Sequence, residues 1–153
     1  MIEETTRKGI TFTVHGPPVA KQRAKAARRG NYVTMYTPKE TVSFENLVKL
    51  SFRQQIGADF EMFTGPVLME VKAYKLRPKG HYGTGRNAGV LKASAPEHNI
   101  TKPDVSNVLK ACEDALNGIA YTDDCHIIKA VSSKHYGTPR TEIEIWPAAR
   151  GQG

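Results

Sequence analysis

Residues 102–124, KPDVSNVLKACEDALNGIAYTDD, carry the pattern that decides the fold and contain most of the candidate chemistry. At about 100° per residue, the apolar side chains gather on one side of a helix and the polar ones on the other. The apolar side consists of Val105, Val108, Leu109, Cys112, Ala115, Leu116 and Ile119. Gly118 is a common type of C-terminal stop. The stretch therefore predicts an amphipathic helix over residues 104–118 with one side in the core.

Aspartates stand at both ends of this predicted helix. Asp104 begins it, and Asp123 and Asp124 follow it in a turn before an apolar run. Taken singly, each has an ordinary structural explanation, because aspartate caps helices and favours turns. If a strand over 126–136 packs beside the helix, however, the turn comes to the helix's N-terminal end. Carboxylates that meet there would make an oxygen-rich site suited to Mg²⁺ or Mn²⁺.

The polar side of the helix adds a cation to this group. Lys110 lies six residues after Asp104, on the same broad side as Ser106 and Asn107. A lysine beside a metal could donate to a phosphate oxygen, while the metal generates hydroxide and offsets phosphate charge. The alternative is an exposed helix lysine, and Asp114 could likewise be a solvated helix residue. The group as a whole indicates phosphodiester chemistry.

The remaining periodic segments predict a single α+β domain over residues 1–153. A mixed β-sheet with two main helices fits best, in the order β-β-α-β-α-β-β. The strand over 31–36 is expected to form a hairpin with the strand over 10–15. The expected strands are 10–15, 31–36, 66–76, 126–136 and 141–146, and the expected helices are 38–56 and 104–118.

The net charge of +7 favours an acidic partner, with nucleic acid the commonest one, although a merely solvated basic surface has the same charge. No acid interrupts the basic residues between Lys21 and Arg29, and residues 77–100 form a long glycine-rich basic loop. Both segments are candidates for DNA-backbone contact, with a solvated loop and simple disorder as the respective alternatives. The candidate DNA contacts are Lys21, Arg23, Lys25, Arg28, Arg29, Lys79, Arg86 and Lys102.

Several other classes of protein fit the sequence poorly. No apolar run approaches membrane-spanning length, and the N-terminal residues lack the apolar core of a signal peptide. The histidines show no zinc-ligand spacing, and no serine has a nucleophile-elbow pattern. Cys112 and Cys125 are expected to be reduced thiols. We therefore expect a cytoplasmic protein without a membrane partner.

The same stretch resembles the signature of the RusA-type Holliday junction resolvases. That signature reads KPD-x-DN-x-x-K, followed by DAL-x-G and an aspartate pair. The earlier stretches FTVHGPPVAKQR and YTPKET are also similar to the family's N-terminal half. The resemblance covers roughly residues 10–146. It implies a homodimeric, Mg²⁺-dependent endonuclease that binds four-way or branched DNA and makes paired symmetric nicks. Such enzymes are often encoded by bacteriophages or prophages.

The resemblance also assigns roles to individual residues. Asp104 matches the first metal-binding aspartate, Asp124 matches the later one, and Lys110 matches the catalytic lysine. Asp123 is a further expected metal ligand beside Asp124. Asn107 and Asp114 match motif positions near the site, as possible supports for the ligands.

Ser106 departs from the family pattern, which has a second metal-binding aspartate at this position. Serine is a neutral and weaker ligand, so metal binding should be weaker. Asp123 or Asn107 could compensate, the protein could bind junctions but cut poorly, or the serine could be an engineered change. The sequence therefore leaves two rivals to the resolvase: a branched-DNA-binding protein without cleavage, and an RNA- or protein-binding module without a metal site.

Overall fold

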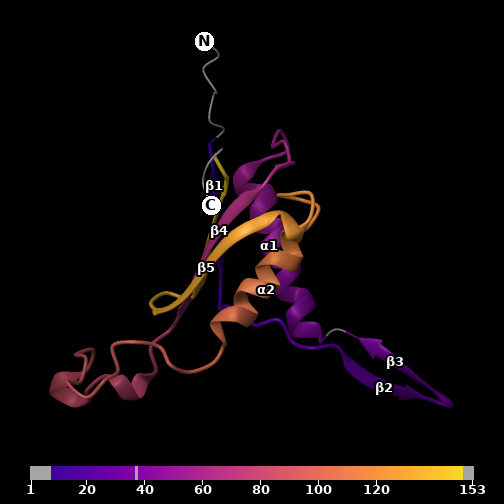
Figure 1. The fold of residues 1–153 in the computed structure, drawn as a ribbon. Helices are drawn as coiled ribbons and strands as arrows, with labels where there is room; N and C mark the ends of the chain where they lie inside the picture. The colour runs from indigo at the N-terminus through magenta and orange to yellow at the C-terminus, as the bar shows by residue number, and fades with distance from the viewer. Residues whose placement is uncertain (1–7, 37, 150–153) are drawn as a thin grey trace, which may run out of the picture.

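The computed structural model describes residues 8–36 and 38–149, which build a four-stranded sheet with helices on one side (Figure 1). The strand order is β1-β6-β4-β5. β5 runs parallel to β4, whereas β6 is antiparallel to both β1 and β4. The predicted α+β class and mixed sheet are confirmed. The strands of this sheet are β1 (Ile10–His15), β4 (Val67–Lys75), β5 (Ile127–Tyr136) and β6 (Arg140–Pro147).

Both predicted helices are present, as α1 (Lys39–Ile56) and α2 (Val105–Leu116). Their apolar sides pack on the alternating apolar residues of the sheet, including Val71 of β4 and Ile143 of β6, which are fully buried. Burying a side chain of this size stabilises the fold by about 1.5–3 kcal/mol relative to leaving it in water. The core is therefore the layer between the helices and one face of the sheet.

The buried side of α1 agrees only in part with the side that we predicted. Val48 and Phe52 are buried as expected, but Val42 and Leu47 are 41% and 38% exposed. Phe44 takes their place, because residues 44, 48 and 52 are four apart and so lie on one line along the helix. Phe52 then packs edge-to-face on Phe12 of β1, with ring centroids 5.5 Å apart.

The predicted hairpin between residues 10–15 and 31–36 is wrong. Residues 32–36 form β3 (Tyr32–Tyr36), which pairs with an additional strand, β2 (Lys25–Arg29), in a separate two-stranded sheet. β1 pairs with β6 instead. The two-residue turn Gly30-Asn31 explains the difference, because Gly30 has a φ of 62° and glycine is the residue that adopts positive φ in tight hairpin turns.

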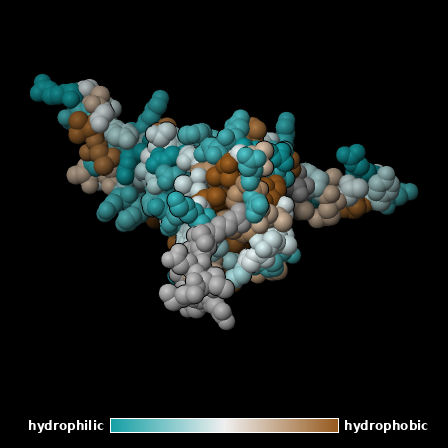
Figure 2. Space-filling model, turned by 90° about the horizontal axis from the view of Figure 1, so that it is seen from above, coloured by the Kyte–Doolittle hydropathy of each residue, from teal (hydrophilic) through white to brown (hydrophobic). Residues whose placement is uncertain are grey.

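The β2–β3 hairpin and the long loop over 77–100 project from opposite ends of the molecule (Figures 1 and 2). Two short 3₁₀ turns, η1 (Lys79–His81) and η2 (Gly85–Asn87), form in the loop. Its chain is folded back on itself, with the Lys92 N–H donating to the His81 carbonyl at 2.9 Å. Neither helix in the described ranges has the length and hydropathy that crossing a bilayer requires.

Candidate functional site

The site is built on the polar side of α2, whose other side is locked into the core. Val108, Cys112 and Leu116 are fully buried. Opposite them, Ser106, Lys110 and Asp114 are spaced four residues apart and so lie on one line along the helix. Because the buried side fixes the rotation of α2, these three side chains have fixed positions relative to the sheet.

Lys110 links two of the predicted acidic residues. Its Nζ lies 3.1 Å from Asp114 Oδ1, one helical turn on, and 3.5 Å from Asp124 Oδ2, which comes from outside the helix. The hydrogen bond to Asp114 raises the pKa of Lys110 above its ordinary value. Lys110 is therefore held as an ammonium ion between two carboxylates.

The chain between β1 and β2 crosses α2 at this point. The Lys21 N–H donates to the Asn107 carbonyl at 2.8 Å, and the Lys21 Nζ lies 2.7 Å from Glu45 of α1 and 3.4 Å from Asp114. The hydrogen bond to Glu45 raises the pKa of Lys21. Sequence reasoning placed Lys21 among the DNA contacts, but its charge is already paired within the protein. Asp114 consequently sits between two ammonium groups.

Asp104 occupies the N-cap position of α2 without acting as a side-chain cap. Its exposed carboxylate accepts a hydrogen bond from Asn107 Nδ2 at 3.3 Å, and no hydrogen bond from a backbone N–H of the helix reaches it. The structural explanation of Asp104 as a cap is therefore not supported by its hydrogen bonds. Its carboxylate faces solvent and is available to a ligand.

The aspartate pair lies beside the middle of α2, and not at its N-terminal end as we predicted. After α2 the chain turns back along the helix: Tyr121 Oη donates to the Glu113 carbonyl, Asp124 reaches Lys110, and Ser132 Oγ donates to the Val105 carbonyl. β5 thus runs opposite to α2, with Asp124 before its first residue beside Lys110 and Ser132 beside the start of the helix.

The turn itself is held by Asp123. Its side chain accepts from the Cys125 N–H at 3.4 Å, at the start of η3 (Asp124–His126). A hydrogen bond with Asp124 lowers the pKa of Asp123 below its ordinary value.

Within the described ranges, no group of three or more His, Cys, Asp or Glu residues is arranged to hold a metal ion. The residue one turn before Lys110 on the same line of α2 is Ser106, so a hydroxyl stands where the family pattern has a carboxylate. The candidate ligands that remain, Asp104, Asp123 and Asp124, offer carboxylate oxygen atoms. Mg²⁺ commonly takes only one or two carboxylates together with water and substrate phosphate. The donor set therefore fits Mg²⁺ when a phosphate completes it.

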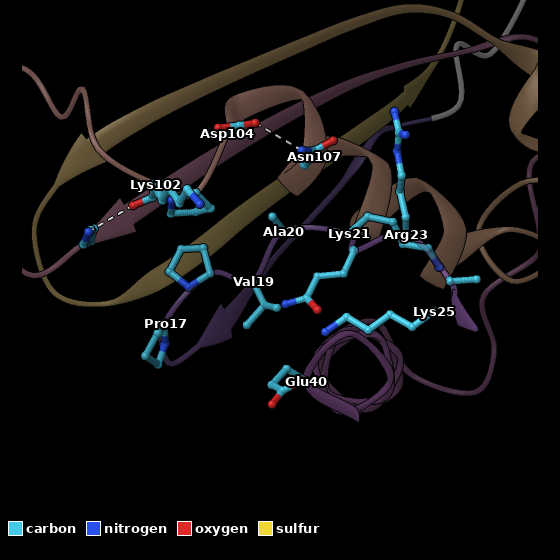
Figure 3. Close-up of a pocket in the computed structure, with 15 residues that line it drawn as sticks. Pro17, Val19, Ala20, Lys21, Arg23, Lys25, Glu40, Lys102, Asp104 and Asn107 are labelled. Atoms are coloured by element: carbon cyan, nitrogen blue, oxygen red, sulfur yellow. Dashed lines mark hydrogen bonds between the residues drawn. The ribbon is translucent and has the colours of Figure 1, made fainter. Parts of the chain in front are cut away.

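An open groove of about 850 Å³ runs beside Asp104 (Figure 3). Its walls come from the chain before β2, the N-terminal end of α1, the end of β4 and the start of α2. Cations outnumber acids in this lining, which suits a polyanionic backbone. Its charged side chains are Lys21, Arg23, Lys25, Glu40, Lys75, Lys102 and Asp104.

The structure divides the other predicted DNA contacts among three places. Arg23, Lys25 and Lys102 line the groove, Arg28 and Arg29 lie on β2, and Lys79 and Arg86 lie in the 3₁₀ turns of the far loop. Sequence reasoning missed Glu45 and Lys75. Glu45 had no detectable signal, because its pairing with Lys21 depends on how α1 packs against the preceding chain. Lys75 stands at the end of a recognised strand, where a basic residue beside the following basic loop was a usable signal.

Comparisons with known proteins identify a family. The model of the family described as Endodeoxyribonuclease RusA matches residues 15–146, which include the groove, α2 and the aspartate pair. The protein YqaN of Bacillus subtilis (strain 168), described as uncharacterized, is 35% identical over 142 residues, covering 89% of this chain and 94% of YqaN. Because the family model and the shared sequence each cover most of its length, this chain belongs to the RusA endodeoxyribonuclease family.

Proposed function

We propose that this protein is a divalent-metal-dependent endonuclease that resolves four-way DNA junctions by paired symmetric hydrolysis of phosphodiester bonds. The observation that carries the proposal is the Lys110 ammonium held against Asp124, on a helix whose first residues border a basic groove. Membership of an endodeoxyribonuclease family supports the cleavage of DNA. The junction preference, the metal and the paired cuts are the proposed parts.

The residues take the following roles in this proposal. Asp104 and Asp124, helped by Asp123, would hold Mg²⁺, with Mn²⁺ as the alternative metal. The metal would supply charge compensation for the phosphate and lower the pKa of a bound water. Lys110 donates a hydrogen bond to a phosphate oxygen as negative charge develops there. Asp114 positions Lys110 through the 3.1 Å contact, and Asn107 orients Asp104 through its amide.

The partners follow from charge and symmetry. Arg23, Lys25 and Lys102 in the groove hold DNA through its phosphates, and the two projecting arms extend that contact through Arg28, Arg29, Lys79 and Arg86. A homodimer would place equivalent sites on a two-fold junction. We propose a cytoplasmic protein of bacterial, phage or prophage origin with no membrane partner.

A second candidate is a branched-DNA-binding protein with weak or no cleavage. The hydroxyl of Ser106 in place of a carboxylate, together with the lack of a three-residue metal group among the described residues, favours it. Restoring the acid distinguishes the two. If the serine limits catalysis, Ser106→Asp increases metal-dependent cutting by about 10-fold or more, as expected for a restored metal ligand.

The decisive experiment compares a synthetic four-way junction with linear duplex of the same sequence, with and without Mg²⁺. We expect paired symmetric nicks in the junction that require metal and disappear in Asp124→Asn. Asp59→Asn, an exposed acid after α1, is the matched control and should cut normally. Tight, junction-selective binding by the natural chain without cutting would contradict the proposed nuclease and favour the binding protein, and a gain of cutting in Ser106→Asp would then identify the serine as the cause.

A further inference from the structure

The β2–β3 hairpin exposes more apolar surface than a solvated arm requires. Tyr32, Val33, Met35 and Tyr36 are 65%, 62%, 64% and 49% exposed, respectively. In Figure 2 the hairpin is the projection at the right, where hydrophobic and hydrophilic residues lie side by side. Large apolar groups that gather on an exposed element usually mark an interaction surface.

The register of the hairpin sorts these residues onto two different faces. Tyr32 is paired with Arg29, and Tyr36 is paired with Lys25. Cross-strand partners lie on the same face of a hairpin, with Cβ atoms about 4.5–5.5 Å apart. Each tyrosine on this face, the tyrosine face, therefore stands beside a cation. Between the two pairs lie only the small residues Ala27 and Thr34.

The opposite face has a different character. It carries Val33 opposite Arg28 and Met35 opposite Ala26, so it has no aromatic ring. The two faces are alike in exposure of their large side chains but differ in chemistry. Only the tyrosine face combines flat rings with positive charge at each ring.

An aromatic ring beside a cation is the usual arrangement for binding unpaired nucleotides. The ring stacks on a base, and the cation contacts the adjoining phosphate. Tyr32 and Tyr36 are four residues apart in β3, so their Cα atoms are separated by about 13 Å along the strand. That interval equals about four stacked base steps of 3.4 Å each. The small residues between the rings leave room for the intervening nucleotides.

The charge of the arm decides between a nucleic acid and a second protein as its partner. From residue 16 to residue 39 the chain has no acid, and besides Lys21, which is paired with Glu45 and Asp114, its cations are Arg23, Lys25, Arg28, Arg29 and Lys39. A second copy of such an arm would be repelled, whereas a nucleic-acid strand is attracted. The arm also leaves from the chain that crosses α2, where the Lys21 N–H is bonded to Asn107.

We propose that Tyr32 and Tyr36 stack on unpaired bases at the branch point of the DNA, with Arg29 and Lys25 on the adjoining phosphates. The inference rests on the proposed function, which supplies the DNA substrate. It assigns the recognition of unstacked bases to the β2–β3 hairpin. Paired duplex lacks free base faces at this spacing, so the tyrosine face discriminates branched or single-stranded DNA from duplex.

The test uses the full chain in buffer with a chelator, so that binding is measured without cleavage. The variant Tyr32→Ala/Tyr36→Ala is compared with Val33→Ala/Met35→Ala, which removes side chains of similar exposure from the opposite face. The probes are a four-way junction with 2-aminopurine at the crossover, a single-stranded oligonucleotide and a linear duplex. The conservative variant Tyr32→Phe/Tyr36→Phe keeps both rings.

We expect the tyrosine-to-alanine variant to lose about 10-fold in affinity for the junction and the single strand per ring removed, together with the 2-aminopurine signal. Duplex affinity stays within about 2-fold of the natural chain, and the phenylalanine variant behaves like the natural chain. Equal losses for both faces, equal losses for duplex and junction, or a lost dimer in place of lost DNA would each overturn the inference.

These outcomes are separable from failure of the proposed function. If the natural chain cuts junctions with metal but the tyrosine variant binds every probe normally, only the stacking inference fails. If the natural chain never cuts, yet the single strand is bound through the tyrosines, the resolvase proposal fails and the stacking arm remains.

Discussion

The polar side of α2 and the β2–β3 hairpin are both rich in charge, yet they are built in opposite ways. Behind the polar residues of α2 lies a fully buried apolar side, and their charges are paired with Lys21 of the chain before β2 and with Asp124 in the turn before β5. The large side chains of the hairpin are about half to two-thirds exposed. The comparison indicates that the packed core supports the charged residues of α2, whereas little of the rest of the molecule supports the hairpin.

The contrast has a physical basis in how much apolar surface each element buries against the rest of the protein. A two-stranded hairpin by itself is only marginally stable in water, and here the tight Gly30-Asn31 turn sets its register. α2, in contrast, takes its position from the main core. Mutations in the two regions should therefore separate stability and catalysis from DNA binding.

The largest expected effect tests the support behind the site. Leu116→Ala removes a fully buried side chain from the back of α2 and should lower the free energy of unfolding by about 2–5 kcal/mol. The matched change Val33→Ala on the hairpin should cost less than about 0.5 kcal/mol, as exposed substitutions usually do. Urea denaturation of both variants measures the difference. Similar losses in the two would show that the hairpin is as firmly packed as α2.

The second prediction concerns the charge held by that support. Lys110→Met leaves Asp114 and Asp124 without their shared ammonium and should reduce junction cleavage by about 10²–10³-fold, as removal of a donor to developing negative charge does. Junction affinity should change far less. Lys129→Met, an exposed lysine on β5, is the control for loss of one positive charge. Single-turnover cleavage and separate binding curves check both points, and a parallel loss of affinity and rate would assign Lys110 to binding.

The smallest expected effect belongs to the cations of the arm. Arg28→Gln and Arg29→Gln should each reduce the slope of log affinity against log salt by about 0.9 if each arginine contacts one phosphate. The rate of cleavage at saturating protein should be unchanged, because neither residue lies in the groove beside Asp104. Titrations of the junction at several salt concentrations measure the slope. An unchanged slope in both variants would remove these arginines from the DNA contacts.

Much of the framework was predictable from local patterns. The period of residues 104–118 identified α2 and its buried side, and the alternation in 66–76 and 141–146 identified β4 and β6. These signals are reliable because each element buries one face against a common core, so its own sequence records which face that is. The turn Gly30-Asn31 was also present as a local signal for the hairpin, but the basic residues of β2 lack apolar alternation and were read as a loop.

The sequence by itself therefore determined the class of fold, the two helices, the acidic and basic segments and the family to which the chain belongs. Only the tertiary structure decided that β1 pairs with β6, that Lys21 is neutralised by Glu45 and Asp114, and that Asp124 meets Lys110 beside the middle of α2. The physical reason is the distance along the chain between the residues that interact. Periodicity and turn chemistry act between neighbouring residues, whereas ion pairs and strand order join residues far apart in the chain, whose meeting depends on the packing of the whole core.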